Sequence, residues 1–170
     1  MLGDFQAQVL LEHNKCRYIH HSPPLIWSDS LSEGAQSWAE HLAESGSLKH
    51  SLSTDYGENV AYSSCSLTGY DLSQLWYDEI KHYSFASPGF SSQTGHFTQL
   101  VWASSRELGV GRAVSRDGTF YYVARYSPPG NTLGFFEDNV QFPREDAMVG
   151  RPRKKKSPSP DTLNEMGKIV

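Results

Sequence analysis

GHFTQLVW, residues 95–102, combines a titratable imidazole with side chains that belong in a protein core. His96 comes near its start and is followed by Phe97, Leu100, Val101 and Trp102. An imidazole placed where packing alone is expected is suited to binding a metal ion or exchanging a proton. Three other polar residues occur in comparably unusual surroundings, and we expect all four side chains to converge on one site.

The first of these residues, His50, follows a strongly patterned helix. Apolar residues from Leu31 to Ala43 recur at helical spacing and predict a helix of about four turns. Ser30 and Glu33 have the spacing of a capping box, and Gly46 is a predicted C-terminal cap. His50 comes directly afterwards in SLKHS, where a loop can hold its ring against the body of the protein.

The other two residues are glutamates. Glu79 belongs to a helix predicted over 70–83 and shares its apolar face with Leu72, Leu75 and Trp76. A carboxylate on such a face has to be paired, protonated or bound to a metal, so an internal salt bridge remains an alternative to a site role. Glu58, in the sequence GEN, begins a predicted extended segment, and taken alone it would be an ordinary exposed glutamate.

The remaining elements indicate one mixed α and β domain. A helix is predicted over 4–19, and SPPL ends it because each proline disfavours helical backbone in the preceding residue. Strands are predicted over 108–115 and 120–127, joined by a turn at Asp117-Gly118. Residues 128–143 form a closing loop, so we place one domain at 1–143 and a separate tail at 144–170.

Composition limits the classes of function. No apolar run approaches the ~20 residues of a membrane span, and the start MLGDFQAQ does not resemble a signal peptide, so we expect a protein that is not secreted. Cys16 and Cys65 are expected to be thiols, as in a reducing compartment. Residues 1–143 contain 8 Lys and Arg against 15 Asp and Glu. This acidic body argues against nucleic-acid binding, which requires a basic surface.

The tail has the opposite charge, with 7 Lys and Arg against 4 Asp and Glu. We expect it to be disordered, because its basic run is followed by two Ser-Pro pairs and contains few apolar residues. Clustered basic residues favour binding to an anionic membrane surface; the alternatives are a solvated tail and a nuclear-import signal. The candidate membrane-binding residues are Arg151, Arg153, Lys154, Lys155 and Lys156.

Four motifs in the same order, GEN, WYDE, GHFTQLVW and YSPPGN, make the chain resemble the CAP superfamily over about residues 4–142. That superfamily comprises cysteine-rich secretory proteins, antigen 5 and plant pathogenesis-related class 1 proteins. The chain looks most like its intracellular, cysteine-poor branch. The resemblance implies an α+β fold, a three-layer α/β/α sandwich with a small antiparallel sheet. It also implies a cytoplasmic protein, peripheral on the cytosolic face of Golgi or other membranes, that could form a homodimer.

The resemblance also implies a cleft lined by His50, Glu58, Glu79 and His96. The two histidines would be ligands for zinc or another divalent cation, and the two glutamates would hold water or the metal. Imidazole and carboxylate are both ordinary zinc ligands. We therefore expect a protein that binds lipid surfaces or protein partners, more than an enzyme. Two alternatives remain: a metal-dependent hydrolase with Glu58 or Glu79 as general base, and a structural, self-associating module.

Overall fold

The computed structural model describes residues 2–149 and 166–169. The elements in chain order are α1 (Asp4–Ile19), β1 (Ile26–Trp27), α2 (Asp29–Ser45), β2 (Gly57–Ser63), α3 (Gly69–Tyr77), the 3-10 helix η1 (Asp78–His82), α4 (Gly95–Val101), β3 (Glu107–Val114), β4 (Phe120–Ser127), α5 (Phe136–Asn139), α6 (Glu145–Val149) and β5 (Met166–Ile169). Among these residues, no helix is both long enough and apolar enough to cross a bilayer.

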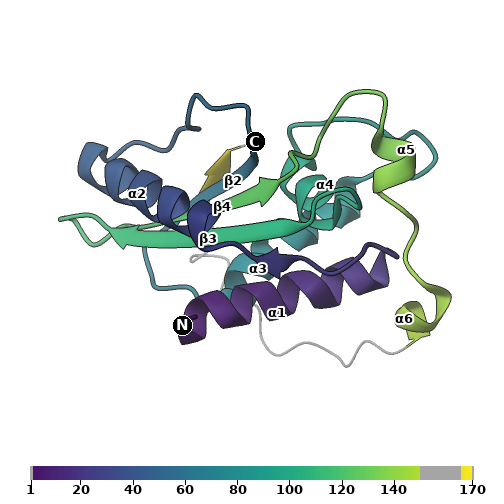
Figure 1. Cartoon of the computed structure of the whole chain (residues 1–170), viewed down its shortest axis with the longest axis horizontal. Helices are drawn as coiled ribbons and strands as arrows, with labels where there is room; N and C mark the ends of the chain where they lie inside the picture. Colours follow the sequence, from purple (N-terminus) through teal and green to yellow (C-terminus); the bar gives the residue numbers. More distant parts are fainter. Residues whose placement is uncertain (1, 150–165, 170) are drawn as a thin grey trace.

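A five-stranded sheet in the order β1-β3-β4-β2-β5 forms the middle layer. Helix α2 covers one face, while α1, α3 and α4 cover the other (Figure 1). Strands β3, β4, β2 and β5 pair antiparallel, and the short β1 pairs parallel with β3. The fold class expected from the sequence, an α+β protein built as a three-layer sandwich, is confirmed.

Helix α2 lies very close to the sheet. Ala35 and Ala39 of α2 are fully buried. A Cβ added at Gly111 of β3 would come within 2.3 Å of the α2 backbone at Gln36. Small residues on both sides therefore set this approach. The predicted cap at Gly46 is confirmed, with φ at 61°. The capping box predicted at Ser30 is wrong, because the helix begins at Asp29 and its capping residue lies two positions before Ser30.

At that N-terminus, Ser28 is the capping residue. Its backbone is extended, and its hydroxyl accepts a hydrogen bond from the Leu31 N–H. A capping box does occur in the protein, at α3, where Thr68 and Asp71 satisfy each other's backbone N–H groups. Similar Ser, Thr and Asp residues near both helix starts make such caps easy to misplace by sequence spacing alone.

Arg17 of α1 is fully buried, and its guanidinium binds backbone carbonyl groups. It donates to Pro23, Leu100, Trp102 and Ser105 at 2.8 to 3.1 Å. Burial lowers the pKa of Arg17 to about 10, with a smaller contribution from Arg106, so the group stays charged at neutral pH. Arg17 thereby connects α1 to the C-terminal end of α4.

Two predicted elements differ in detail from the structure. The helix predicted over 70–83 is confirmed as far as Tyr77, after which the chain tightens into η1, so Glu79 lies in a 3-10 turn. The predicted hairpin is confirmed, with Gly118 at φ 87° in its turn. Cys16 is buried, Cys65 is exposed, and no disulfide joins them.

The range predicted to be a disordered tail contains two ordered elements, α6 and β5. Neither was foreseen from the sequence. The boundary of the domain at residue 143 stays a prediction. The candidate membrane-binding residues lie outside the described residues; they are Arg151, Arg153, Lys154, Lys155 and Lys156.

Candidate functional site

His50 and Glu58 form the first of two histidine–glutamate pairs. His50 lies in the loop after α2, and Glu58 lies on β2 with only 6% of its side chain exposed. The His50 Nδ1–H donates to Glu58 Oε1 at 3.0 Å. The opposite ring nitrogen, Nε2, is buried and has no hydrogen-bond partner among the described residues.

Glu58 receives three further hydrogen bonds that fix its carboxylate. The backbone N–H of Ser51 donates to Oε1 at 2.9 Å, while the Ser51 hydroxyl and Arg125 Nε donate to Oε2 at 2.7 and 3.1 Å. Burial alone would raise the pKa of Glu58. The hydrogen bonds from His50, Ser51 and Arg125 outweigh burial, so the pKa lies below the ordinary value of a glutamate.

His96 and Glu79 form the second pair, which is almost fully buried. The His96 Nδ1–H donates to Glu79 Oε2 at 2.9 Å, and the exposed fractions of the two side chains are 1% and 5%. The ring of His96 also stacks on Trp76. Glu79 Oε1 accepts from the backbone N–H groups of His96 and Phe97, which begin α4 and have no partner within that helix.

Strand β5 also contacts the second pair. Lys168 Nζ lies 2.6 Å from Glu79 Oε2 and donates to the Leu75 carbonyl at 3.0 Å. The His96 Nε2 contacts the carbonyl oxygen of Ile169. Burial alone would raise the pKa of Glu79, but the hydrogen bonds and charges of His96 and then Lys168 lower it below its ordinary value.

The two pairs are neighbours through β2. Asn59, which follows Glu58, donates from its side-chain amide to the carbonyl of His96 at 3.1 Å. However, no three His, Cys, Asp or Glu side chains of the described residues come close enough together to surround one metal ion. A hollow of about 360 Å³ borders Glu79, His96 and Lys168 without including His50 or Glu58. The structure thus arranges the four predicted residues as two pairs.

The donor atoms of each pair are of a kind that could bind a divalent cation. In each pair the carboxylate accepts a hydrogen bond from Nδ1–H, which leaves Nε2 as the ring nitrogen that could bind a cation. Histidines that bind zinc commonly have a carboxylate on their other nitrogen. The buried Nε2 of His50, which has no hydrogen-bond partner among residues 2–149 and 166–169, fits such a ligand directly. In His96 the corresponding atom faces Ile169, so this nitrogen becomes available only when β5 moves away.

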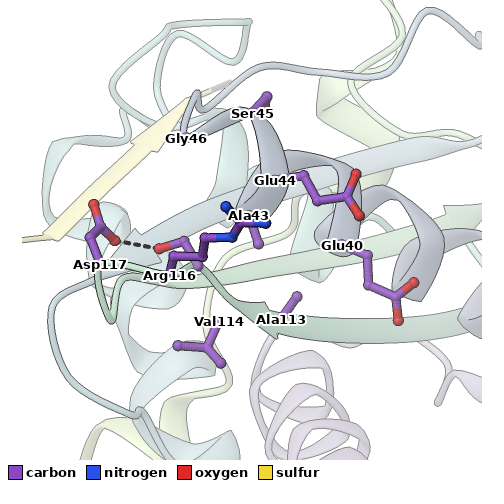
Figure 2. Close-up of a pocket in the computed structure, with 10 residues that line it drawn as sticks. Glu40, Ala43, Glu44, Ser45, Gly46, Ala113, Val114, Arg116 and Asp117 are labelled. Carbon is purple, nitrogen blue, oxygen red and sulfur yellow. Dashed lines mark hydrogen bonds between the residues drawn. The ribbon is translucent and has the colours of Figure 1, made fainter.

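A larger hollow, of about 710 Å³, lies between the C-terminal end of α2 and the β3–β4 hairpin. Figure 2 shows Arg116 extending from the hairpin toward the end of α2. The carboxylate of Asp117 accepts a hydrogen bond from the hydroxyl of Ser115. The lining of this hollow includes Glu40 and Glu44 but no histidine or cysteine. Because this lining offers neither an imidazole nor a thiol, we place the candidate site at the two histidine–glutamate pairs instead.

Comparison with known proteins agrees with this architecture. The crystal structure of NaASP2 with Zn2+ matches with a TM-score of 0.67 and 19% identity, over 85% of this chain and 88% of that one. At this identity the likeness shows the fold alone. The model of the cysteine-rich secretory protein (CAP) family matches residues 10–126. The chain belongs to the cysteine-rich secretory protein family.

Two relatives narrow the type of CAP protein. The chain is 44% identical over 146 residues to the human Golgi-associated plant pathogenesis-related protein 1, covering 83% of this chain and 95% of that protein. It is 34% identical over 127 residues to a PR-1 type pathogenesis-related protein of Sambucus nigra, covering 72% and 75%. The protein is therefore a CAP-domain protein of the type that includes these two relatives.

Sequence reasoning missed Lys168 and Ile169, which complete the second pair's surroundings. The segment MGKI has only four residues and does not alternate apolar with polar side chains, so it carries no strand signal of its own. Ser51 and Arg125 were also missed. Arg125 lies directly opposite Glu58 in the β2–β4 register, a cross-strand relation that local spacing does not reveal.

Proposed function

We propose that this CAP-domain protein acts by binding an anionic membrane surface or protein partners, and that His50 and His96 hold zinc or another divalent cation. The observation that carries the cation site is the pairing of each imidazole with a buried carboxylate. This pairing leaves Nε2 as the available ring nitrogen, and in His50 that atom is buried without a partner among the described residues. A divalent ion bound there would supply a Lewis acid with open coordination positions.

The hydrogen bonding of the two glutamates supports binding more than catalysis. A general base requires a pKa near the working pH and room to accept a proton. Glu58 and Glu79 each accept four hydrogen bonds or charge contacts, and the pKa of each is lowered. Their role in this proposal is to orient the histidines. The hydrolase alternative would require one of these carboxylates to leave its partners.

Membrane binding is supported by charge and by one relative. The acidic body is followed by the basic run from Arg151 to Lys156, which would be attracted to anionic headgroups. The human relative named above is described as Golgi-associated. We accordingly place this protein at the cytosolic face of Golgi or other membranes, as a peripheral protein. A homodimer stays a prediction, and no role in nucleic-acid binding is proposed.

Co-sedimentation of the full chain with vesicles tests the membrane proposal. Replacing Lys154, Lys155 and Lys156 by Gln should weaken binding to anionic vesicles at low salt by up to about 100-fold, since each lysine contributes about 1 kcal/mol near such a surface. Zwitterionic vesicles should not bind, and salt should weaken the binding. A matched control replaces three exposed basic residues of the body by Gln: Lys49, Lys81 and Arg116. Equal losses in both triple variants would contradict the proposal.

A further inference from the structure

Strand β5 closes an edge of the sheet that would otherwise be open. It pairs antiparallel with β2, from Ser63 opposite Met166 to Val60 opposite Ile169. On its other side β2 is paired with β4 along its whole length. An uncovered β2 would therefore present a row of backbone N–H and C=O groups, which is the usual acceptor for an added strand.

The residues Gly167, Lys168 and Ile169 of β5 each meet a different feature of this edge. Gly167 lies against the ring of Tyr62, so closely that an added Cβ would come within 1.8 Å of a ring carbon. Lys168 points to the opposite face of the sheet from α2, where it reaches Glu79 and the carbonyl of Leu75 in α3. Ile169 packs against the apolar cluster on the α2 face. The edge thus accepts glycine, then a cation, then an aliphatic residue.

The acceptor site has contacts of its own that do not involve β5. Without Lys168, the Glu79 carboxylate would still be held by the ring of His96 and by two backbone N–H groups of α4. Lys168 is also partly solvated, with 28% of its side chain exposed. A partly exposed ion pair and four residues of strand pairing form a modest interaction, one that can be replaced by an equivalent ligand.

We propose that the β2 edge, together with the Glu79–His96 pair, is a binding site for an extended peptide of the type Gly-Lys-aliphatic, and that residues 166–169 of this chain occupy it as an intramolecular ligand. This peptide site does not rest on the metal or membrane proposals. Occupation of the peptide site would compete with cation binding, because the His96 Nε2 that would hold a cation is covered by Ile169 while the strand is docked.

Gly167→Val in the full chain tests the proposal, because a valine side chain cannot fit beside Tyr62. Amide hydrogen exchange should become at least 10-fold faster, once the strand is displaced, at those of β2 residues 60–63 whose N–H groups face β5 and not β4. The control is Gly89→Val, the same substitution at a position with open space around it, which should leave exchange unchanged. Lys168→Glu, which places a like charge against Glu79, provides a second variant that should also expose β2.

The vacated site should then bind a synthetic peptide with the sequence EMGKIV, residues 165–170. An intramolecular segment has an effective concentration in the millimolar range, so the unsubstituted chain should bind this peptide on the order of 10- to 100-fold more weakly than Gly167→Val. A peptide with glutamate in place of lysine should not bind. If both variants leave β2 exchange unchanged, or if Gly167→Val and the unsubstituted chain bind the peptide equally, the proposal is wrong.

Discussion

The ammonium group of Lys168 and the carboxylate of Glu79 are 2.6 Å apart, and the same carboxylate oxygen also accepts the Nδ1–H of His96. One oxygen of Glu79 thus joins the C-terminal strand to the histidine that we propose as a metal ligand. The remaining oxygen fixes the start of α4. Substitutions in β5 should consequently alter the surroundings of the His96 ring, even though the two segments are far apart in sequence.

Removing either histidine should weaken zinc binding by the full chain. We expect at least a 10-fold loss for His50→Ala and for His96→Ala, because a two-imidazole site loses half of its protein ligands. His41→Ala removes an exposed histidine that stacks on Trp38 and serves as the control. Competition against a fluorescent chelator measures the affinities; zinc binding that survives both site substitutions would place the metal elsewhere.

Displacing β5 should strengthen zinc binding. In Gly167→Val the His96 Nε2 is no longer covered by Ile169, so the cation gains a ligand that the docked strand withholds. We expect the zinc affinity to rise several-fold in the same chelator assay. Gly89→Val should match the unsubstituted chain. An affinity that is equal in all three proteins would show that the strand and the cation do not compete.

Acid should destabilise the fold through His13. Burial, aided by Arg17, lowers the pKa of His13 from 6.5 to about 3 in the folded protein. Below pH 6.5 the unfolded chain therefore binds a proton that the folded chain excludes, so the free energy of unfolding falls as the pH falls toward 3. Between pH 7 and 5 this amounts to about 2 kcal/mol.

Chemical unfolding at several pH values measures this effect. His13→Gln should lower stability at pH 7, because the ring bonds Ser73 and Tyr126, but its stability should depend less on pH between 7 and 5. His82→Gln, at an exposed position, should retain the full dependence. Parallel pH profiles for all three proteins would exclude His13 as the source.

The close approach of α2 to the sheet should make Gly111 intolerant of a side chain. An alanine Cβ would meet backbone atoms of Gln36 and Ala35, which can move only if the helix moves. We expect Gly111→Ala to lower the free energy of unfolding by about 1 to 3 kcal/mol, the usual effect of overpacking. Gly89→Ala is the control. Equal denaturation midpoints would mean that α2 adjusts without cost.

Local sequence patterns predicted the elements whose burial repeats along the chain. Helix α2 follows its apolar spacing, and the β3–β4 hairpin follows strand residues around a glycine turn, because short-range preferences and side-chain periodicity coincide there. The pairing of each candidate histidine with a glutamate required the tertiary fold. His50 and Glu58 are separated by a loop, and His96 and Glu79 belong to different elements.

Features that depend on contacts between distant segments were not predictable in this way. An arginine is ordinarily expected at the protein surface, yet Arg17 is fully buried and its guanidinium donates to four backbone carbonyls. Strand β5 is too short to show a convincing alternation, and its formation depends on the edge that β2 presents. Both features follow from unsatisfied backbone groups elsewhere in the fold.

Arg17 also determines how firmly the candidate site is built. Helix α4 has only seven residues, too few to persist alone in water, and His96 belongs to its first turn. Glu79 fixes one end of this helix, while the guanidinium of Arg17 binds carbonyls at the other. Both ends of this two-turn helix are thereby fixed to the rest of the domain. We expect the imidazole of His96 to keep its orientation whether a strand, a cation or solvent occupies the space beside it.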